Sequence, residues 1–299
     1  MANDFSSDPR CKAFWRFESG ALTADSKGAN TLTAHHAPSE DTADYREGAC
    51  CVDLEKDSSQ YLAIADASLD AGYPLKSGDA TKKFTLCCWV KLETVPGSSE
   101  WANIYSKWLW QTDLTIEIGM TGGYLRVNWA VSATSATFWD AFPISAGRWY
   151  HLGVVIDGVN RIRKVRRYDA TAGTVTNYSS TPYASLRVGA ADTTIGALSN
   201  PGNYLDGKLD EMVIFNDVLL DTEIDAIRNG VFPPPPQLKV FQEVAQVEYS
   251  DTAPRMIVSQ VISQVEYDPI PPPKRQFPVP NPRTLWQSQV EKRTFPGVA

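Results

Sequence analysis

The chain lacks the features that mark membrane, exported and nucleic-acid-binding proteins. No apolar run approaches the length that crosses a membrane, and the N-terminus has no basic segment followed by an apolar one. We therefore expect no membrane partner and no signal peptide. The net charge is −7, and no part of the chain carries the basic stripe that a phosphate backbone requires, so we expect no nucleic acid among its partners.

Histidine and the common hydrolase motifs are also scarce. The chain has three His and contains neither G-x-S-x-G nor H-E-x-x-H. His35 and His36 are adjacent in a predicted loop, and His151 lies in a predicted strand. We interpret all three as loop or strand side chains without a catalytic role.

Cysteine occurs only five times, and its placement argues against a disulfide framework. Neighbouring residues of a strand point to opposite faces, so adjacent cysteines cannot easily share one metal ion or one bridge. We expect buried, reduced thiols that act as small hydrophobic side chains. The five are Cys11, Cys50, Cys51, Cys87 and Cys88.

Proline and glycine divide the chain into two parts. Thirteen of the twenty Pro follow Phe232, whereas the only Gly of that final part is Gly297. A sequence rich in stiff spacers and poor in apolar runs cannot build a core of its own. We therefore predict a globular domain over residues 1–232 and an extended, proline-rich arm over residues 233–299.

The most informative stretch of the domain is its last one, residues 204–230. Apolar residues from Leu209 to Phe215 partly alternate with polar ones, as in a strand with one buried face. Further apolar residues then recur at helical spacing behind Asp221, a candidate N-cap, and Gly230 is placed to end the helix. The apolar residues of this predicted helix are Leu220, Ile224, Ile227 and Val231.

Upstream, some dozen short strands separated by turn signals predict an all-β, two-sheet antiparallel sandwich. We expect 49–54 to pair with 61–65 as a hairpin, and 186–190 to pair with 193–198. A second hairpin is expected at Asp157-Gly158. The predicted strands are 11–17, a short one around Leu32, 49–54, 61–65, 84–92, 103–108, 114–119, 124–130, 137–142, 148–158, 162–169, 186–190 and 193–198.

Six blocks in order resemble the laminin-G-like, concanavalin-A-like jelly-roll domains. They are F-W-R-F-E, C-C-V-D-L-x-x-x-x-S-Q-Y-L, F-T-L-C-C-W-V-K, G-R-W-Y-H-L-G-V-V-I-D-G, T-T-I-G-A-L and G-K-L-D-E-M-V-I-F-N. The resemblance implies a jelly-roll sandwich that is closed by one short helix, here followed by the arm. Because each block is a core or turn pattern, it specifies the fold much better than the function.

The same architecture includes glycoside hydrolases, which in one branch carry two catalytic carboxylates as E-x-D-x-x-E. Retaining chemistry needs these carboxylates about 5 Å apart. None of the three E-x-D pairs is followed by the second Glu, so we expect a non-enzymatic protein. The pairs are Glu55/Asp57, Glu223/Asp225 and Glu266/Asp268.

Some domains of this type hold Ca²⁺ at the rim of the sandwich through oxygen ligands. Asp206 and Asp210 flank the start of the closing strand and are the candidate ligands, although no cofactor is required by the sequence. The alternative is a structural role, in which the Asp210-Glu211 pair binds the backbone amides of a neighbouring turn.

Tryptophan is denser between residues 100 and 140 than a sandwich core needs. Exposed rings would stack on sugars, whereas buried rings would belong to the core or to an interface. Five Trp lie in this region, Trp129 among them, and the candidates for a glycan site are Trp101, Trp108, Trp110 and Trp139.

The arm contains a repeat with an offset of eighteen residues. VFQEVAQVEY at 240–249 and VSQVISQVEY at 258–267 share six residue types at matching places, and 286–291 is a shorter copy. Each copy alternates as a strand does. Disorder of the isolated arm is one interpretation, and β-augmentation of neighbouring subunits is the other. The candidate docking residues are Val240, Val244, Val247, Tyr249, Val258, Ile262, Val265, Tyr267 and Trp286.

The repeat resembles segments of phage and prophage structural proteins, in which adhesive domains are joined to extended docking arms. This resemblance implies a virion decoration protein, assembled in the host cytoplasm. Its partners would be other virion proteins and further copies of the chain, and its jelly roll would be displayed toward surface glycans. The alternative is a carbohydrate-binding module or a glycoside hydrolase of the same fold.

Overall fold

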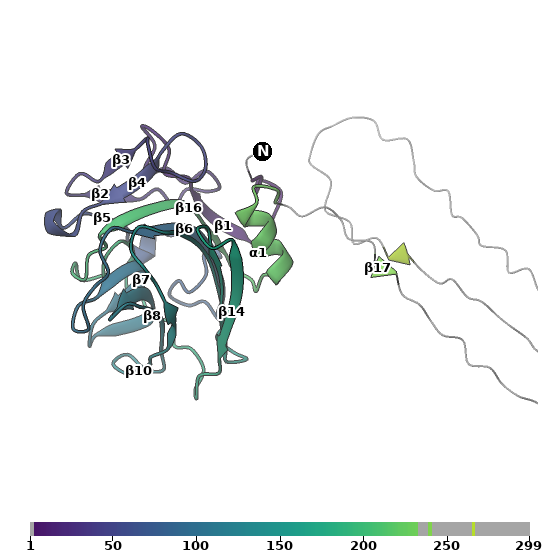
Figure 1. Ribbon diagram of the computed structural model, residues 1–299. Coiled ribbons are helices and arrows are strands. Elements are labelled where there is room, and N and C mark those ends of the chain that lie inside the picture. The colour runs from purple at the N-terminus through teal and green to yellow at the C-terminus, as the bar shows by residue number, and fades with distance from the viewer. Residues whose placement is uncertain (1–2, 233–238, 241–264, 267–299) are drawn as a thin grey trace, which may run out of the picture. The chain divides into compact units, whose positions relative to one another are not determined.

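The computed structural model describes residues 3–232 and two short segments, 239–240 and 265–266. The chain divides into two units, residues 1–234 and 235–299. The sequence placed this boundary two residues earlier, after Phe232. Within residues 3–232 the chain forms two antiparallel sheets and one α-helix, which is the predicted all-β jelly-roll sandwich (Figure 1).

Each sheet of the sandwich contains eight strands. The first sheet has the spatial order β14 (Thr174–Ser180), β13 (Ile162–Asp169), β12 (Trp149–Asp157), β6 (Lys83–Leu92), β16 (Gly207–Phe215), β4 (Cys51–Leu54), β3 (Ser39–Asp41), with β1 (Cys11–Trp15) also paired to β16. The second sheet has the order β10 (Ala136–Thr137), β9 (Tyr124–Ala130), β8 (Asp113–Thr121), β7 (Ala102–Leu109), β15 (Thr193–Ile195), β5 (Tyr61–Ile64), β2 (Thr33–His35), with β11 (Asp140–Pro143) also paired to β9.

The main core lies between the two sheets and follows from strand alternation. In β6 every second residue from Phe84 to Leu92 is fully buried in this core, as the sequence predicts. The other face of β6 is covered as well, because Cys87 and Trp89 are also buried. All five cysteines are buried free thiols, which confirms that prediction.

Strand β16 carries a bulge that explains its imperfect alternation. Asp210 pairs with Trp89 and Val213 with Cys87, so Glu211 and Met212 together face Cys88. The extra residue shifts the phase of the strand. Leu209, Met212 and Ile214 therefore reach the main core, while Val213 and Phe215 face the opposite side.

Helix α1 (Asp221–Arg228) covers that opposite face of the first sheet (Figure 1). Ile224 and Ile227 pack there with Val213 and Phe215, and Gly153 of β12 makes the approach possible, since a Cβ at Gly153 would lie 2.6 Å from Ile224. The helix ends at Arg228, and the predicted stop residue Gly230 follows two residues later with a φ of +67°. Two short 3₁₀ helices, η1 (Lys56–Ser58) and η2 (Asp66–Ser68), complete the domain.

The predicted N-cap of the helix is wrong by one residue. Leu220, not Asp221, is the N-cap, and the Glu223 carboxylate accepts the Leu220 N–H at 2.7 Å. Asp221 instead lies 3.2 Å from an Arg166 nitrogen. Leu220 and Val231, which the helical spacing placed on the buried face, are exposed.

The predicted hairpin of 49–54 with 61–65 is wrong, because β4 belongs to the first sheet and β5 to the second. Residues 55–60 cross between the sheets through η1. Val52 and Leu62 both lie in the main core, so each strand buries its apolar face without pairing to the other. Strand alternation is the same in both arrangements, which is why the sequence could not distinguish them. The hairpin of β12 with β13 is confirmed.

Two further strand predictions differ from the structure, and strand β14 was not predicted. Residues 186–190 form no strand, because their backbone N–H groups bind separate places, including Gly158 O and Ala130 O. The predicted strand 137–142 is divided between β10 and β11, which both pair with β9. Strand β14 was missed because its residues are mostly exposed and polar, so it carries little apolar signal.

Only two segments of the arm lie in the described residues. Lys239–Val240 (β17) pairs antiparallel with Val265–Glu266 (β18), so the first and second copies of the repeat meet at Val240 and Val265. The remaining docking candidates lie outside the described residues. These are Val244, Val247, Tyr249, Val258, Ile262, Tyr267 and Trp286.

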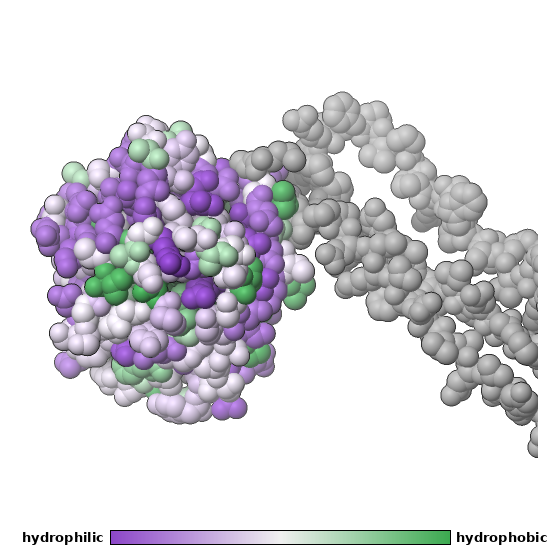
Figure 2. All heavy atoms as spheres, viewed as in Figure 1, coloured by the Kyte–Doolittle hydropathy of each residue, from purple (hydrophilic) through white to green (hydrophobic). Residues whose placement is uncertain are grey.

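Two further observations concern the exterior. Within the part of the chain that the structure describes, no helix is both long and apolar enough to cross a membrane. Figure 2 shows that the visible face of residues 3–232 is mostly hydrophilic, with hydrophobic side chains in small separate spots.

The two ends of the domain are joined, which yields a first prediction. Asp4 N donates to Phe232 O at 3.0 Å, and the buried Phe232 ring packs against Phe5 and Phe215. We expect Phe232→Ala to lower the free energy of unfolding by about 3–5 kcal/mol, because it removes a buried ring. Chemical denaturation of residues 1–232 measures this value.

The matched control is the adjacent Val231→Ala. Val231 is 45% exposed, and its replacement should change stability by about 0.5 kcal/mol or less. Equal effects of the two substitutions would contradict the anchoring role of Phe232.

Candidate functional site

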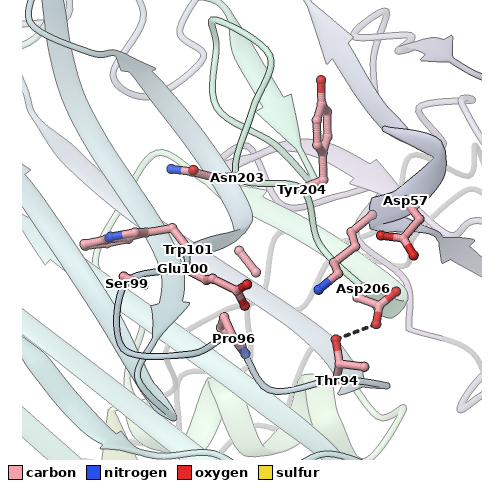
Figure 3. A pocket seen from close by; sticks show the side chains of 11 residues that line it. Asp57, Thr94, Pro96, Ser99, Glu100, Trp101, Asn203, Tyr204 and Asp206 are labelled. Carbon is pink, nitrogen blue, oxygen red and sulfur yellow. Dashed lines mark hydrogen bonds between the residues drawn. The ribbon is translucent and has the colours of Figure 1, made fainter.

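An open hollow of about 330 Å³ lies at one rim of the sandwich. Its walls come from η1, from the loop between β6 and β7, and from the segment that leads into β16 (Figure 3). The lining residues are Lys56, Asp57, Thr94, Pro96, Ser99, Glu100, Trp101, Ala102, Asn203, Tyr204 and Asp206.

Hydrogen bonds hold two of these walls together. Glu93 N donates to Asp206 O at 3.0 Å, and the Thr94 hydroxyl donates to the Asp206 carboxylate. On the loop itself, Gly97 N donates to Glu100 Oε2 at 3.1 Å. The β6–β7 loop is therefore fixed both to itself and to the segment before β16.

The segment before β16 is also fixed to strand β7. Asn103 N donates to Asn203 O at 3.0 Å. Asn203 adopts a positive φ of +55°, a conformation that Asn tolerates better than most residues. The turn places the Asn203 and Tyr204 side chains at the hollow.

Trp101 supplies the largest apolar surface of the hollow. Its side chain is only partly buried, and the Arg126 guanidinium carbon lies 5.0 Å from the ring centroid. Arg126 in turn forms an ion pair with Asp140. The ring is thus held in place while part of it faces solvent, next to hydroxyl, amide and carboxylate groups that can bind sugar hydroxyls.

A row of aromatic side chains continues from the hollow across the second sheet. Tyr204 lies 6.1 Å from Tyr61, and the ring of Tyr61 stacks on His35 with a centroid distance of 4.2 Å. No local pattern predicts this row, because its members come from three separate segments.

The four candidate Trp residues do not form one site. Trp108 is fully buried beside Leu114 and Leu198, so its prediction as a ligand residue is wrong and the core interpretation holds for it. Trp110 is 50% exposed but lies beyond the opposite end of β7 from Trp101, roughly 30 Å away along the strand. Trp139 is partly buried against the main core, with the Arg163 guanidinium 5.1 Å from its ring. Only Trp101 lines the hollow.

The candidate calcium ligands are separated as well. Asp206 lines the hollow, whereas Asp210 is fully buried, and four strand residues span roughly 13 Å. The two side chains therefore cannot share one ion. Asp210 Oδ2 accepts the backbone N–H groups of Arg46 at 2.8 Å and Glu47 at 3.0 Å, which is the alternative structural role.

A different acidic cluster lies next to the hollow. Asp53, Glu55 and Glu93 bring carboxylate oxygens within 4.8 Å of one another. Burial, together with the nearby Glu93 carboxylate, raises the pKa of Asp53 to about 6. No local pattern predicts this cluster, because Glu93 comes from a strand end about forty residues after Asp53. Calcium at the rim stays a prediction.

The E-x-D pairs show no catalytic arrangement among the described residues. Glu223 lies 2.6 Å from an Arg10 nitrogen and Asp225 lies 2.5 Å from an Arg166 nitrogen, so both carboxylates stabilise the helix contact. Of the first pair, Asp57 lines the hollow and Glu55 belongs to the acidic cluster. The third pair extends beyond the described residues at Asp268.

The two-sheet fold is that of a jelly-roll domain. A sequence profile described as the Concanavalin A-like lectin/glucanases superfamily matches residues 56–225, more than half of the chain, and the chain belongs to this superfamily. Among curated proteins, none matches the chain. The superfamily description names two kinds of carbohydrate-directed protein, lectins and glucanases.

Solved structures support the fold. The binding domain of Botulinum Neurotoxin DC in complex with SialylT is similar with a TM-score of 0.53 at 11% identity, covering 76% of this chain and 53% of that chain. The same domain in complex with rat synaptotagmin II gives 0.56 at 10% identity, with 76% and 53% covered. This chain therefore spans about half the length of these proteins, and the likeness concerns the fold alone.

The buried acids of the β16 bulge predict a pH-dependent stability. Burial raises the pKa of Asp210 to about 7 and that of Glu211 to about 8, above the value of about 4 expected in the unfolded chain. The folded state then holds more protons, so the free energy of unfolding should fall as the pH rises from about 5 to about 8. Denaturant titrations across this range measure the slope.

The test variants are Asp210→Asn and Glu211→Gln, which keep an acceptor oxygen but cannot ionise. Each should flatten the dependence of stability on pH. An unchanged slope in both variants would show that other groups cause it.

Proposed function

We propose that the chain is a non-catalytic, carbohydrate-binding decoration protein of a bacteriophage particle. In this proposal residues 1–232 are displayed outward and bind surface glycans, and residues 233–299 dock on neighbouring virion subunits. The observation that carries the glycan-binding part is the rim hollow, in which Trp101 and Tyr204 stand beside amide, hydroxyl and carboxylate groups.

The chemistry of the hollow suits a sugar. A sugar ring offers an apolar face to an aromatic ring and hydroxyl groups to surrounding acceptors and donors. Trp101 provides the aromatic face, while Asn203 and Asp206 provide hydrogen-bonding groups. The hollow is open to solvent, so we expect weak single contacts that many displayed copies would convert into avidity.

The arm supports the display part of the proposal. Its strand-like repeats are separated by polyproline spacers, a composition suited to adding strands to other chains. The arm follows Phe232, which is anchored in the domain by Phe5 and Asn3. A force that pulls on the arm would therefore act on the domain at Phe232, which is held by these contacts.

We expect Trp101→Ala to weaken glycan binding by about tenfold or more, which is ~1.4 kcal/mol, because it removes the stacking surface. A glycan array finds the ligand, and calorimetry compares the variants. Trp110→Ala is the matched control, because Trp110 is an exposed Trp beyond the opposite end of the same strand, and it should bind like the parent.

Equal losses in both variants would contradict the assignment of the hollow. The same incubations report on catalysis, since the second candidate is a glycoside hydrolase and Asp53, Glu55 and Glu93 bring carboxylate oxygens within 4.8 Å of one another beside the hollow. Chromatography should show the oligosaccharides unshortened, whereas shortened products would favour the hydrolase.

Truncation after Phe232 tests the arm. The shortened protein should remain soluble and folded, because the anchoring contacts end at Phe232, yet it should be missing from purified particles. Mass spectrometry of virions, with the full chain as reference, measures incorporation. Incorporation of the truncated protein would refute the docking role.

A further inference from the structure

We propose that the rim hollow selects glycans without negatively charged groups and rejects those that carry carboxylate, sulfate or phosphate. This inference rests on the proposed glycan-binding function and names its ligand class. It comes from the charges around the hollow, where the side chains of Asp57, Glu100 and Asp206 face a single ammonium group, that of Lys56.

The carboxylates come from both sides. Figure 3 shows Glu100 beside Trp101 on one wall and Asp57 with Asp206 on the facing wall. A sugar that stacks on Trp101 would therefore have carboxylates around it. Carboxylates accept hydrogen bonds from neutral hydroxyl or amino groups, but they repel an acidic substituent.

A second group of acids lies beside the hollow, and Lys208 offsets part of its charge because it lies 3.5 Å from Glu93. Glu55 and Glu93 directly adjoin the lining residues Lys56 and Thr94 in the chain, and with Asp53 they form the acidic cluster. The raised pKa of Asp53 reflects burial and the repulsion of these neighbours.

The nearby cations are already paired. Lys208 binds Asp41 and lies 3.5 Å from Glu93, and Lys91 lies 2.5 Å from Asp44. Arg126, under Trp101, forms a two-point pair with Asp140. These residues neutralise their own partners, so Lys56 alone cannot balance the carboxylates of the hollow.

Selection by charge can be distinguished from selection by shape, because only selection by charge depends on the salt concentration. Repulsion between partly exposed charges weakens with salt, since the screening length is about 8 Å at about 0.15 M and shorter above that. A steric clash with an added sugar would not depend on salt.

The experiment compares matched glycans, each with and without a terminal sialic acid, on an array and by calorimetry. At low salt the sialylated member should bind at least tenfold more weakly than its neutral partner. This affinity gap between the sialylated glycan and its neutral partner should narrow at high salt. In Asp57→Asn the gap should also narrow, because one carboxylate charge of the hollow is removed.

Val159→Lys is the control for net charge. It adds the same positive increment at an exposed turn beyond the far end of β6, and it should leave the gap unchanged. If no glycan of either kind binds, the proposed function fails. If glycans bind but the sialylated members bind equally or better, or if the gap responds to neither salt nor Asp57→Asn, the charge selection alone is wrong.

Discussion

Strand β16 must be hydrogen-bonded on both sides and buried on both faces, and most of the domain depends on this requirement. It pairs with β6 along one side and with β4 and then β1 along the other. Its bulge changes the phase of the alternation, so Leu209 and Met212 both reach the main core although they are three residues apart. The same bulge places the Asp210 carboxylate against the backbone of residues 46–47 and leaves two acids buried, where their ionisation is costly.

The rim hollow is a consequence of how this strand begins. The segment before β16 is hydrogen-bonded to the β6–β7 loop through Asp206 and to β7 through Asn203. These bonds bring residues from distant parts of the chain together as the lining of one hollow. The hollow thus rests on paired strands. Its carboxylates are not balanced by neighbouring cations, because Lys208, Lys91 and Arg126 are engaged by acids outside it.

Much of the fold could be predicted, because alternation and turn residues are local signals. The β6 core face, the β12–β13 hairpin and the strand–helix end of the domain follow from spacing alone. The errors occur where local signals are ambiguous. Val52 and Leu62 alternate correctly but belong to opposite sheets. Residues 186–190 are apolar enough for a strand, yet their backbone N–H groups donate to four different residues.

The sequence by itself determined the two-sheet architecture, the short closing helix and the free, buried cysteines, because each depends on which residues must leave water. Only the tertiary structure decided which exposed groups stand together. The sequence does not distinguish Trp101 from Trp108, but Trp101 lines the hollow and Trp108 is fully buried. Likewise Asp53 meets Glu93, and Tyr204 meets Tyr61, through contacts between separate segments. No local pattern predicts such contacts, because they depend on how strands far apart in the chain are ordered in the two sheets.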